Sequence, residues 1–404
     1  MTSVVSGKKI ILGISGGIAA YKTASLVRLF IKAGAQVRVI MTPASKDFVT
    51  PLTLSTLSKN QVYSTFYQSD DENAIWNNHV ELGLWADLIV IAPATANTMS
   101  KMVNGNCDNL LIATYLSAKC PVYFAPAMDL DMYKHPSTIA SFAALTTFGN
   151  SIIPAESGEL ASGLLGEGRM AEPENILAFI EADLEKKLPL KGKNILITAG
   201  PTFEPIDPVR FIGNHSTGKM GFDIANCAAN LGANVTLVSG PTHLHVINSS
   251  IQVIKINTAK EMFDACNELF VNTDVFIAAA AVADYKPKEI ATQKIKKIEA
   301  NFAIHLEKTI DILATLSISK LNQFVIGFAL ETEYEIDNAI LKIQKKNLDL
   351  IVLNSLQDEG AGFGKPTNKV TFIDKELSIE PQFLKPKEEV AFDIVQKIIN
   401  HYHV

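Results

Sequence analysis

Two similar segments, far apart in the chain, constrain the fold more than any other feature. Residues 9–14 (KIILGI) form a short apolar run that ends in Ser15-Gly16-Gly17, and a helix-period pattern follows. Residues 193–198 (KNILIT) repeat this arrangement and end in Ala199-Gly200-Pro201. An apolar strand, a glycine turn and then a helix are typical of the first unit of a parallel α/β sheet. We therefore expect one such sheet in each half of the chain.

Further apolar runs alternate with helical patterns in both halves, as expected for strands buried on both faces. At 404 residues the chain is also too long for a single hydrophobic core. The prediction is two doubly wound, Rossmann-like α/β domains with mainly parallel sheets. A helical pattern and then Pro189-Leu190-Lys191-Gly192 place the boundary near residue 190, giving domains 1–190 and 191–404. The other predicted strands are 37–41, 88–92, 122–125, 235–239, 275–280, 324–328 and 350–353.

Charge and cysteine content limit the class of protein. The net charge of −6 gives no reason to expect nucleic acid or an anionic membrane as a partner. Four cysteines without CxxC spacing indicate neither disulfides nor zinc, and fit a reducing compartment. Lys8-Lys9 and the apolar run after them could be a signal peptide, but Gly13, Gly16 and Gly17 interrupt that run. We expect a cytoplasmic protein.

Small polar residues follow three predicted strands of the first half. Ligands of doubly wound sheets bind beyond the carboxyl ends of the strands, so these residues should meet there. Hydroxyl and amide groups suit a phosphate, a ribityl chain and the polar edge of a flavin, whereas no GxGxxG pattern for NAD follows the first strand. The glycines alone are equally compatible with a structural turn. The residues concerned are Ser15, Gly16, Gly17, Thr42, Ser45, Pro93, Thr95 and Asn97.

Beyond these strand-end residues, 92–98 (APATANT) and 126–133 (PAMDLDMY) form a specific pattern. With it the first half resembles the flavoprotein cysteine decarboxylase family, and within it the phosphopantothenoylcysteine decarboxylases. The resemblance implies that the strand-end residues bind FMN, and that FMN oxidises the substrate thiol so that loss of CO2 becomes possible. It also implies that His79 is a base for thiol oxidation; from the residues alone, a surface histidine capping a helix is the alternative. It is carried by residues 13–22 (GISGGIAAYK), His79, 92–98 (APATANT), 105–110 (GNCDNL), 126–133 (PAMDLDMY) and 157–170 (SGELASGLLGEGRM).

Two residues depart from the family pattern. Asp129 stands where Asn is usual, and an ionised carboxylate cannot donate a hydrogen bond to a substrate carboxylate. Ser162 stands where a proton-donating Cys is usual, and a hydroxyl is a much poorer acid. Our hypothesis is that Asp129 is neutral and that Ser162 or a water relays the proton. The alternative is an impaired or regulatory flavin domain beside an active ligase.

The second half contains a glycine-rich segment with two interpretations. Residues 213–219 have the form GxxxxGK of a P-loop, yet Met220 stands where a magnesium-binding Ser or Thr belongs. Ser216-Thr217-Gly218 still opens a helix and can offer backbone N–H groups to an anion. After the strand 275–280, Asp284 could reach a nucleotide's metal. Residues 294–297 (KIKK) are either a solvated surface run or a clamp for triphosphate charge.

These segments resemble the phosphopantothenate–cysteine ligase family across most of 191–404. The resemblance implies that Asn214 contacts an acyl-nucleotide intermediate, Arg210 supports phosphopantothenate binding, and Lys294 with Mg²⁺ on Asp284 neutralises pyrophosphate. It implies CTP as the nucleotide. The CTP site would comprise Ala281, Asp284, Lys294, Ile310, Asp311, Ile312, Leu313, Phe328, Lys342 and Lys346, with Ile310 where proline is common. The matching segments are 198–221, 280–287, 294–297, 327–332, 346–354 and a GAGFG flap at 360–364.

Together the two resemblances imply successive steps of coenzyme A biosynthesis. Phosphopantothenate and cysteine would be ligated with CTP, and the product would be decarboxylated to 4'-phosphopantetheine. They also imply a homo-oligomer, with trimeric flavin domains and dimeric ligase domains, up to a dodecamer. A flavin prenyltransferase and a flavin-binding regulatory subunit are the rival interpretations of the first half.

Overall fold

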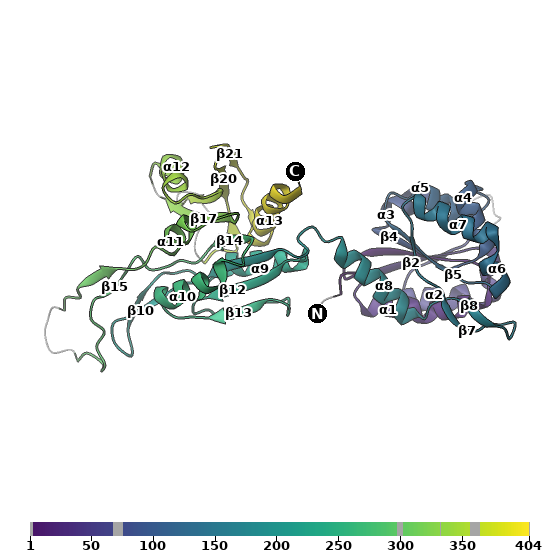
Figure 1. Ribbon diagram of the computed structural model, residues 1–404, viewed down its shortest axis with the longest axis horizontal. Coiled ribbons are helices and arrows are strands. Elements are labelled where there is room, and N and C mark those ends of the chain that lie inside the picture. Colours follow the sequence, from purple (N-terminus) through teal and green to yellow (C-terminus); the bar gives the residue numbers. More distant parts are fainter. Residues whose placement is uncertain (1–2, 68–75, 297–301, 332, 356–363, 404) are drawn as a thin grey trace. The chain divides into compact units, whose positions relative to one another are not determined.

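The computed structural model describes residues 3–67, 76–296, 302–331, 333–355 and 364–403. They form two compact units, one ending at Lys186 and the other beginning at Lys187 (Figure 1). Each unit has its own sheet and its own hydrophobic core. None of the described helices is both long and apolar enough to cross a membrane.

The first unit is built on a six-stranded parallel sheet in the order β3-β2-β1-β4-β5-β6. The strand order reverses between β1 and β4, which is the switch point where doubly wound sheets bind ligands. The strands are β1 (Lys9–Ile14), β2 (Gln36–Met41), β3 (Val62–Tyr63), β4 (Leu88–Ala94), β5 (Val122–Pro126) and β6 (Ser151–Ile152).

Helices cover both faces of this sheet. Successive side chains of a strand point to opposite faces, so Ile10 and Leu12 join the core with α1, α2 and α8, while Ile11 joins the core with the other helices. An antiparallel hairpin, β7 (Glu156–Glu159) and β8 (Leu165–Arg169), stands apart from the sheet. The helices are η1 (Ile18–Lys22), α1 (Thr23–Lys32), η2 (Pro43–Asp47), α2 (Pro51–Ser58), α3 (His79–Trp85), α4 (Ala96–Asn104), α5 (Leu110–Ser117), α6 (Leu130–Lys134), α7 (Pro136–Thr147) and α8 (Pro173–Lys186).

The second unit is built on an eight-stranded sheet in the order β13-β12-β9-β14-β17-β18-β20-β21. The first six strands are parallel to one another, β20 pairs antiparallel with β18, and β21 pairs antiparallel with β20. Mainly parallel sheets thus confirm the predicted fold class for both units. The strands are β9 (Asn194–Ala199), β12 (Asn234–Ser239), β13 (Gln252–Lys255), β14 (Val275–Ala278), β17 (Phe324–Glu331), β18 (Leu350–Ser355), β20 (Val370–Asp374) and β21 (Ile379–Pro381).

Two helical layers enclose this sheet as well, with α9 and α13 on one face and α10, α11 and α12 on the other. Short two-stranded sheets decorate the unit, and β10 and β15 extend away from the main sheet (Figure 1). The helices are α9 (Lys219–Asn230), α10 (Ala259–Phe270), α11 (Ile312–Ile318), α12 (Glu335–Lys345) and α13 (Lys387–His403). The short strands are β10 (Phe203–Pro205), β11 (Phe211–Gly213), β15 (Tyr285–Pro287), β16 (Leu306–Lys308), β19 (Thr367–Asn368) and β22 (Lys385–Pro386).

One predicted strand, 275–280, is too long. β14 ends at Ala278, and the N–H groups that follow turn to other partners. The N–H of Ala280 donates to the hydroxyl of Thr198 at 3.2 Å, and that of Ala281 donates to the carbonyl of Gly200 at 2.9 Å. Tertiary contacts with β9, and not local apolarity, therefore end this strand.

Candidate functional site

The three predicted strand ends of the first unit meet at one edge of its sheet. Ser15 follows β1, and its buried hydroxyl donates to the carbonyl of Pro93 at 2.7 Å. The same oxygen accepts from the N–H of Thr95 at 3.2 Å. Thr95 in turn caps α4, with its own hydroxyl accepting from Thr98 N. The loops after β1 and β4 are thus fixed to each other beside the N-terminus of a nine-residue helix.

Gly16 lets the loop after β2 join this arrangement. A Cβ at Gly16 would lie 2.7 Å from the Cβ of Ala44 and 3.1 Å from its carbonyl oxygen, both far inside ordinary contact distance. Ala44 belongs to the segment that carries Thr42 and Ser45. The glycine is therefore needed for close approach of two backbones, the situation in which this residue type is most useful.

Thr42 has an unusual buried group. Its N–H donates to Ile14 O at 2.9 Å, and its carbonyl accepts from the buried Ser45 hydroxyl at 2.7 Å. Its own hydroxyl oxygen is buried and has no hydrogen-bond partner among the described residues. A buried hydroxyl without a partner costs free energy, and a ligand with polar groups would satisfy it. Together with the α4 N-terminus, where Asn97 is exposed, this edge suits a phosphorylated flavin.

A cavity of about 510 Å³ adjoins the first of these strand ends. It is lined by residues from η1, from the loop after β5 and from the β7–β8 hairpin, among them Gly17 and Asp129. Asp129 caps α6, and its carboxylate accepts from the N–H of Leu130 at 2.6 Å. A neutral Asp129 stays a prediction.

The other two predicted catalytic residues of this unit do not line the cavity. Ser162 is exposed in the turn between β7 and β8. His79 is the first residue of α3, and its ring lies 6.3 Å from the rings of both Phe66 and Trp76. Its Nδ1 atom is buried without a partner among the described residues. The capping alternative is wrong, because Asn78 caps α3 by accepting from two backbone N–H groups.

The structure adds two cations that the sequence patterns did not single out. Lys22 is only 6% exposed and lines the same cavity, with its ammonium donating to Glu172 at 2.9 Å and to Met170 O at 3.0 Å. Arg169, also a lining residue, pairs with Glu172 at 2.6 Å. The Lys22 hydrogen bond first, and that of Arg169 second, lower the pKa of the Glu172 carboxyl. Lys22 ends the segment 13–22 that carries the family resemblance, and its position there was the signal from which the sequence could have indicated it.

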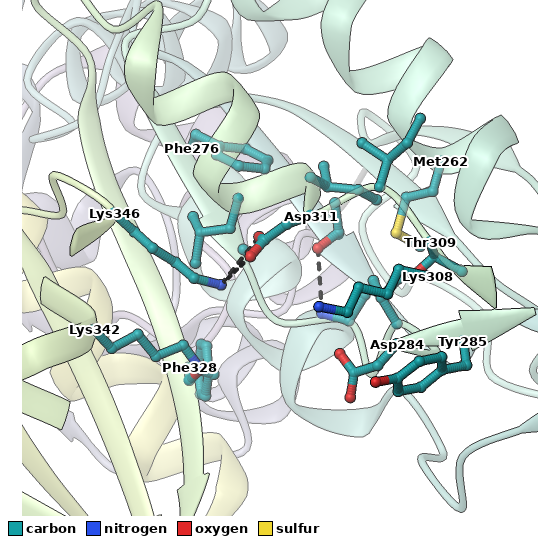
Figure 2. A pocket seen from close by; sticks show the side chains of 17 residues that line it. Met262, Phe276, Asp284, Tyr285, Lys308, Thr309, Asp311, Phe328, Lys342 and Lys346 are labelled. Atoms are coloured by element: carbon teal, nitrogen blue, oxygen red, sulfur yellow. Dashed lines mark hydrogen bonds and ion pairs between the residues drawn. The ribbon is translucent and has the colours of Figure 1, made fainter. Parts of the chain in front are cut away.

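The second unit has two adjoining cavities, of about 510 and 360 Å³, at the carboxyl edge of its sheet. They share one wall, formed by Ala280, Val282, Asp284, Phe328 and Lys342. The larger cavity, which we call the nucleotide cavity, is also lined by Thr198, Phe276 and residues 308–313 (Figure 2). Of the predicted CTP residues, it contains Asp284, Ile310, Asp311, Ile312, Leu313, Phe328, Lys342 and Lys346.

Two lysines of α12 and the loop after it give the nucleotide cavity its charge. Lys346 pairs with Asp311, which also caps α11 by accepting from Ala314 N at 3.0 Å. Burial, the largest single influence, opposes ionisation of Asp311, but the hydrogen bonds from Lys346 and Ala314 N and the charges of Lys346 and Lys342 together outweigh it, so the pKa of Asp311 is lowered. Lys342 donates to the carbonyl of Phe328 at 2.8 Å. Burial, and then the neighbouring charge of Lys346, lower the pKa of Lys342.

Asp284 is exposed in the wall shared by both cavities. Its backbone carbonyl accepts from Thr309 N at 3.0 Å, which holds the segment after β14 in place. Among the described residues, no group of three or more His, Cys, Asp or Glu side chains could hold a metal ion. Any Mg²⁺ here would therefore take most of its oxygen ligands from a nucleotide and water, as Mg²⁺ commonly does.

The smaller cavity, which we call the acyl cavity, contains Asn214 and the start of α9. The Asn214 amide donates to the carbonyls of Ala281 at 3.0 Å and Val282 at 3.2 Å, so it is fixed to the shared wall. Gly218 precedes α9 with φ +84°, a conformation that favours glycine, and no side chain caps the helix. The N–H of Lys219 donates to the Thr217 hydroxyl at 3.4 Å, and the next N–H groups of the first turn can receive an anion.

The P-loop interpretation of 213–219 is not supported by this geometry. A β10–β11 hairpin, and not a strand of the main sheet, leads into the segment. Lys219 pairs with Asp223 at 2.9 Å, along its own helix, and with Glu388 at 3.3 Å. A P-loop lysine would reach nucleotide phosphates instead.

Arg210 and Lys294 line neither cavity. Arg210 lies in the β10–β11 hairpin, and its guanidinium bonds to Asp207 and to the carbonyl of Ile295. Lys294 is exposed in the neighbouring loop. Lys297, residue 332 and most of the GAGFG segment (360–363) lie outside the described residues.

Each unit matches a known protein family. The first matches the family model Flavoprotein over residues 2–185, and the second matches the DNA/pantothenate metabolism flavoprotein C-terminal domain over residues 190–402. A protein called Cysteine/Cysteine sulfinic acid decarboxylase, from an unknown prokaryotic organism, is 52% identical over 360 residues, covering 88% of this chain and 100% of that protein.

A second relative and a solved structure share a different name. The Coenzyme A biosynthesis bifunctional protein CoaBC of Bacillus subtilis (strain 168) is 41% identical over 397 residues, covering 98% of this chain and 97% of that protein. The crystal structure of the C-terminal domain of a Coenzyme A biosynthesis bifunctional protein CoaBC is 41% identical, covers 53% of this chain and 98% of its own, and gives a TM-score of 0.46.

Proposed function

Since this chain belongs to the family of bifunctional coenzyme A biosynthesis proteins, we propose that its two units catalyse successive steps of that pathway. It is an enzyme that joins a flavoprotein decarboxylase domain to a ligase domain, and it acts on small molecules. We assign CTP-dependent ligation of 4'-phosphopantothenate with cysteine to residues 191–404. We assign decarboxylation of the product to residues 1–190.

The shared wall between the two cavities of the ligase unit carries this proposal. A carboxylate resists attack by an amine until a good leaving group is attached, so the acid must meet a nucleotide. In our proposal CTP occupies the nucleotide cavity, the acid lies in the acyl cavity, and its carboxylate attacks the α-phosphate across the shared wall. Asn214, anchored on Ala281 and Val282, stands where the acyl cytidylate would form.

Charged groups around this wall would stabilise the pyrophosphate that leaves. Lys342 and Lys346 would supply positive charge, and Asp284 would supply a carboxylate to hold Mg²⁺. The uncapped start of α9 adds backbone N–H donors. Magnesium, when bound, would neutralise charge on the triphosphate. The cysteine amine would then attack the acyl cytidylate, release CMP and form the amide.

In the decarboxylase unit, we propose that the strand ends hold FMN, with the α4 N-terminus and the Thr42 hydroxyl as donors to it. When bound, FMN supplies the reversible oxidation that makes loss of CO2 possible. The cavity beside Gly17 would receive the substrate. Lys22 and Arg169, which both pair with Glu172, would place positive charge beside a substrate carboxylate in this cavity. His79 would act as the base.

A second candidate activity comes from the relative named Cysteine/Cysteine sulfinic acid decarboxylase, at 52% identity. Asp129 and Ser162 change the substrate side of the flavin unit relative to the usual family pattern, and free cysteine, whose thiol the flavin would oxidise in the same way, is the second candidate substrate. This activity would require the same flavin and the same cavity but no ligase product.

One product analysis separates these possibilities. The FMN-loaded protein is incubated with phosphopantothenate, cysteine, CTP and Mg²⁺, and the products are identified by mass spectrometry. We expect CMP, pyrophosphate and 4'-phosphopantetheine. Accumulation of phosphopantothenoylcysteine would show an impaired flavin unit, and decarboxylated cysteine without CTP consumption would favour the second candidate. We also propose a cytoplasmic homo-oligomer of trimeric flavin and dimeric ligase domains, up to a dodecamer, which light scattering would test.

A further inference from the structure

Asp207 lies where two extended segments of the ligase unit meet. One is the turn between β10 and β11, which carries Arg210, and the other is the loop that contains Lys294 and Ile295. The Asp207 side chain has no exposed area, although both segments are largely exposed. A fully buried carboxylate needs hydrogen bonds to all of its lone pairs, so its partners define what it does.

The partners of Asp207 come from both segments. Its Oδ1 accepts from the backbone N–H groups of Val209 and Arg210, each at 2.9 Å. Its Oδ2 accepts from Arg210 Nε at 3.0 Å and from the backbone N–H of Ile295 at 3.1 Å. Arg210 Nη2 contacts the same oxygen. Five donors thus converge on one carboxylate, which shapes its own turn and also binds a loop 88 residues further along the chain.

Arg210 completes the link between the two segments. Its Nη2 also donates to the carbonyl of Ile295 at 3.1 Å, so both backbone polar groups of Ile295 are held by the Asp207–Arg210 pair. Lys294 immediately precedes this fixed residue. The Nη1 group of Arg210 makes no hydrogen bond to the described residues, and the side chain is 43% exposed, which leaves it available to a ligand.

We propose that Asp207 is a positioning residue of the ligase, which holds Arg210 and the Lys294 loop in one fixed arrangement so that the two cations act together. This inference rests on the proposed roles of Arg210 toward phosphopantothenate and of Lys294 toward the nucleotide. Arg210, held through Nε and Nη2 on one carboxylate oxygen of Asp207, presents its remaining N–H groups in a defined direction. A loop tied at Ile295 loses less conformational entropy when Lys294 engages phosphates.

The arrangement is insensitive to pH in the range of enzyme assays. The Arg210 hydrogen bond first, and the backbone N–H groups of Val209 and Ile295 with it, keep the pKa of Asp207 far below its ordinary value. A lowered pKa means that the carboxylate stays ionised, and its contacts stay intact, until the pH falls well below the pKa of a free aspartate. Asp207 is therefore suited to a fixed structural link and not to a pH switch.

The substitution Asp207→Asn tests this role in the full-length protein. An amide has the same shape, but its NH2 group faces donors in place of an acceptor, so contacts to Arg210 or Ile295 are lost. Formation of the acyl cytidylate is measured as phosphopantothenate-dependent exchange of labelled pyrophosphate into CTP. We expect a loss of about 10- to 100-fold. Asp264→Asn, which alters an exposed aspartate paired with Lys260, is the matched control and should leave exchange unchanged.

A double-mutant cycle separates positioning from a general loss of folding. If Asp207 acts through Arg210 and the loop that it holds, Asp207→Asn will slow exchange less in an Arg210→Lys background than in the wild-type background. Decarboxylation of supplied phosphopantothenoylcysteine by the same variants should equal that of the wild type, which checks the rest of the chain. Additive effects in the cycle, or normal exchange by Asp207→Asn alone, would overturn the proposal.

Hydrogen exchange of backbone amides keeps the test independent of activity. Asp207→Asn should accelerate exchange at Ile295, whose N–H loses its acceptor, while amides in β9 and β14 keep their protection. Unchanged protection at Ile295 would refute the inference even if the wild type showed no ligase activity. If the wild type forms no cytidylate but Ile295 responds as expected, the proposed function fails and the positioning role of Asp207 stands.

Discussion

Replacement of Thr42 by valine should stabilise the flavin-free protein and weaken flavin binding at the same time. Valine has almost the same shape as threonine and keeps the backbone contacts to Ile14 and Ser45, since those use only main-chain atoms of residue 42. What changes is the buried hydroxyl, which has no partner among the described residues. The substitution therefore isolates one polar atom at the proposed flavin site.

The two effects can be estimated from that atom. An unsatisfied buried hydroxyl costs about 1–3 kcal/mol, so its removal should raise the free energy of unfolding by a similar amount. One kcal/mol corresponds to about 2–4 °C in Tm for a domain of this size. If the hydroxyl donates to a charged group of FMN, its loss costs about 1.5–3 kcal/mol of binding. That loss weakens Kd by about 10- to 150-fold.

Two measurements on Thr42→Val test the expected changes in stability and in FMN affinity. Thermal unfolding of the flavin-free protein gives the first effect, and quenching of FMN fluorescence during titration gives the second. Thr42→Ser, which keeps the hydroxyl, should bind FMN nearly as well as the wild type. Equal FMN affinity for the valine variant would refute the assignment of this hydroxyl as a flavin ligand. A lower Tm without flavin would refute the claim that it is unsatisfied.

Three further predictions concern both units. Gly16→Val should sharply reduce the flavin content of purified protein, read from its absorbance, because the new side chain would collide with Ala44, with at least about 1–3 kcal/mol of overpacking strain. Lys294→Gln should abolish cytidylate formation, whereas Asn214→Asp should form the intermediate but consume it slowly; rapid-quench analysis distinguishes the two, and normal turnover would count against both roles. Because burial lowers the pKa of Lys342, its charge should be lost at a lower pH than that of a free lysine, and KM for CTP should rise there; Lys342→Arg should remove this rise between pH 7 and 10.

Much of the fold could be predicted from local sequence pattern. Apolar runs such as 10–14 without alternating polar residues predict strands buried on both faces, and the structure has them in parallel sheets. Because the ends of parallel strands share one edge, the positions of Ser15, Thr42 and Thr95 along the chain were sufficient to predict their convergence. The end of β14 was not predictable in this way, since Thr198 of β9 and Gly200 of the turn after it decide it.

The amino-acid sequence by itself determined the two α/β units and the strand ends at which we propose their ligand sites, because periodicity and glycine turns are properties of short segments. Only the tertiary structure decided which polar groups are buried together. It pairs Lys22 with Glu172, binds Asp207 to Ile295, and leaves the Thr42 hydroxyl without a partner among the described residues. Such contacts join residues far apart in the chain, and burial, which sets their strength, exists only once the chain has packed.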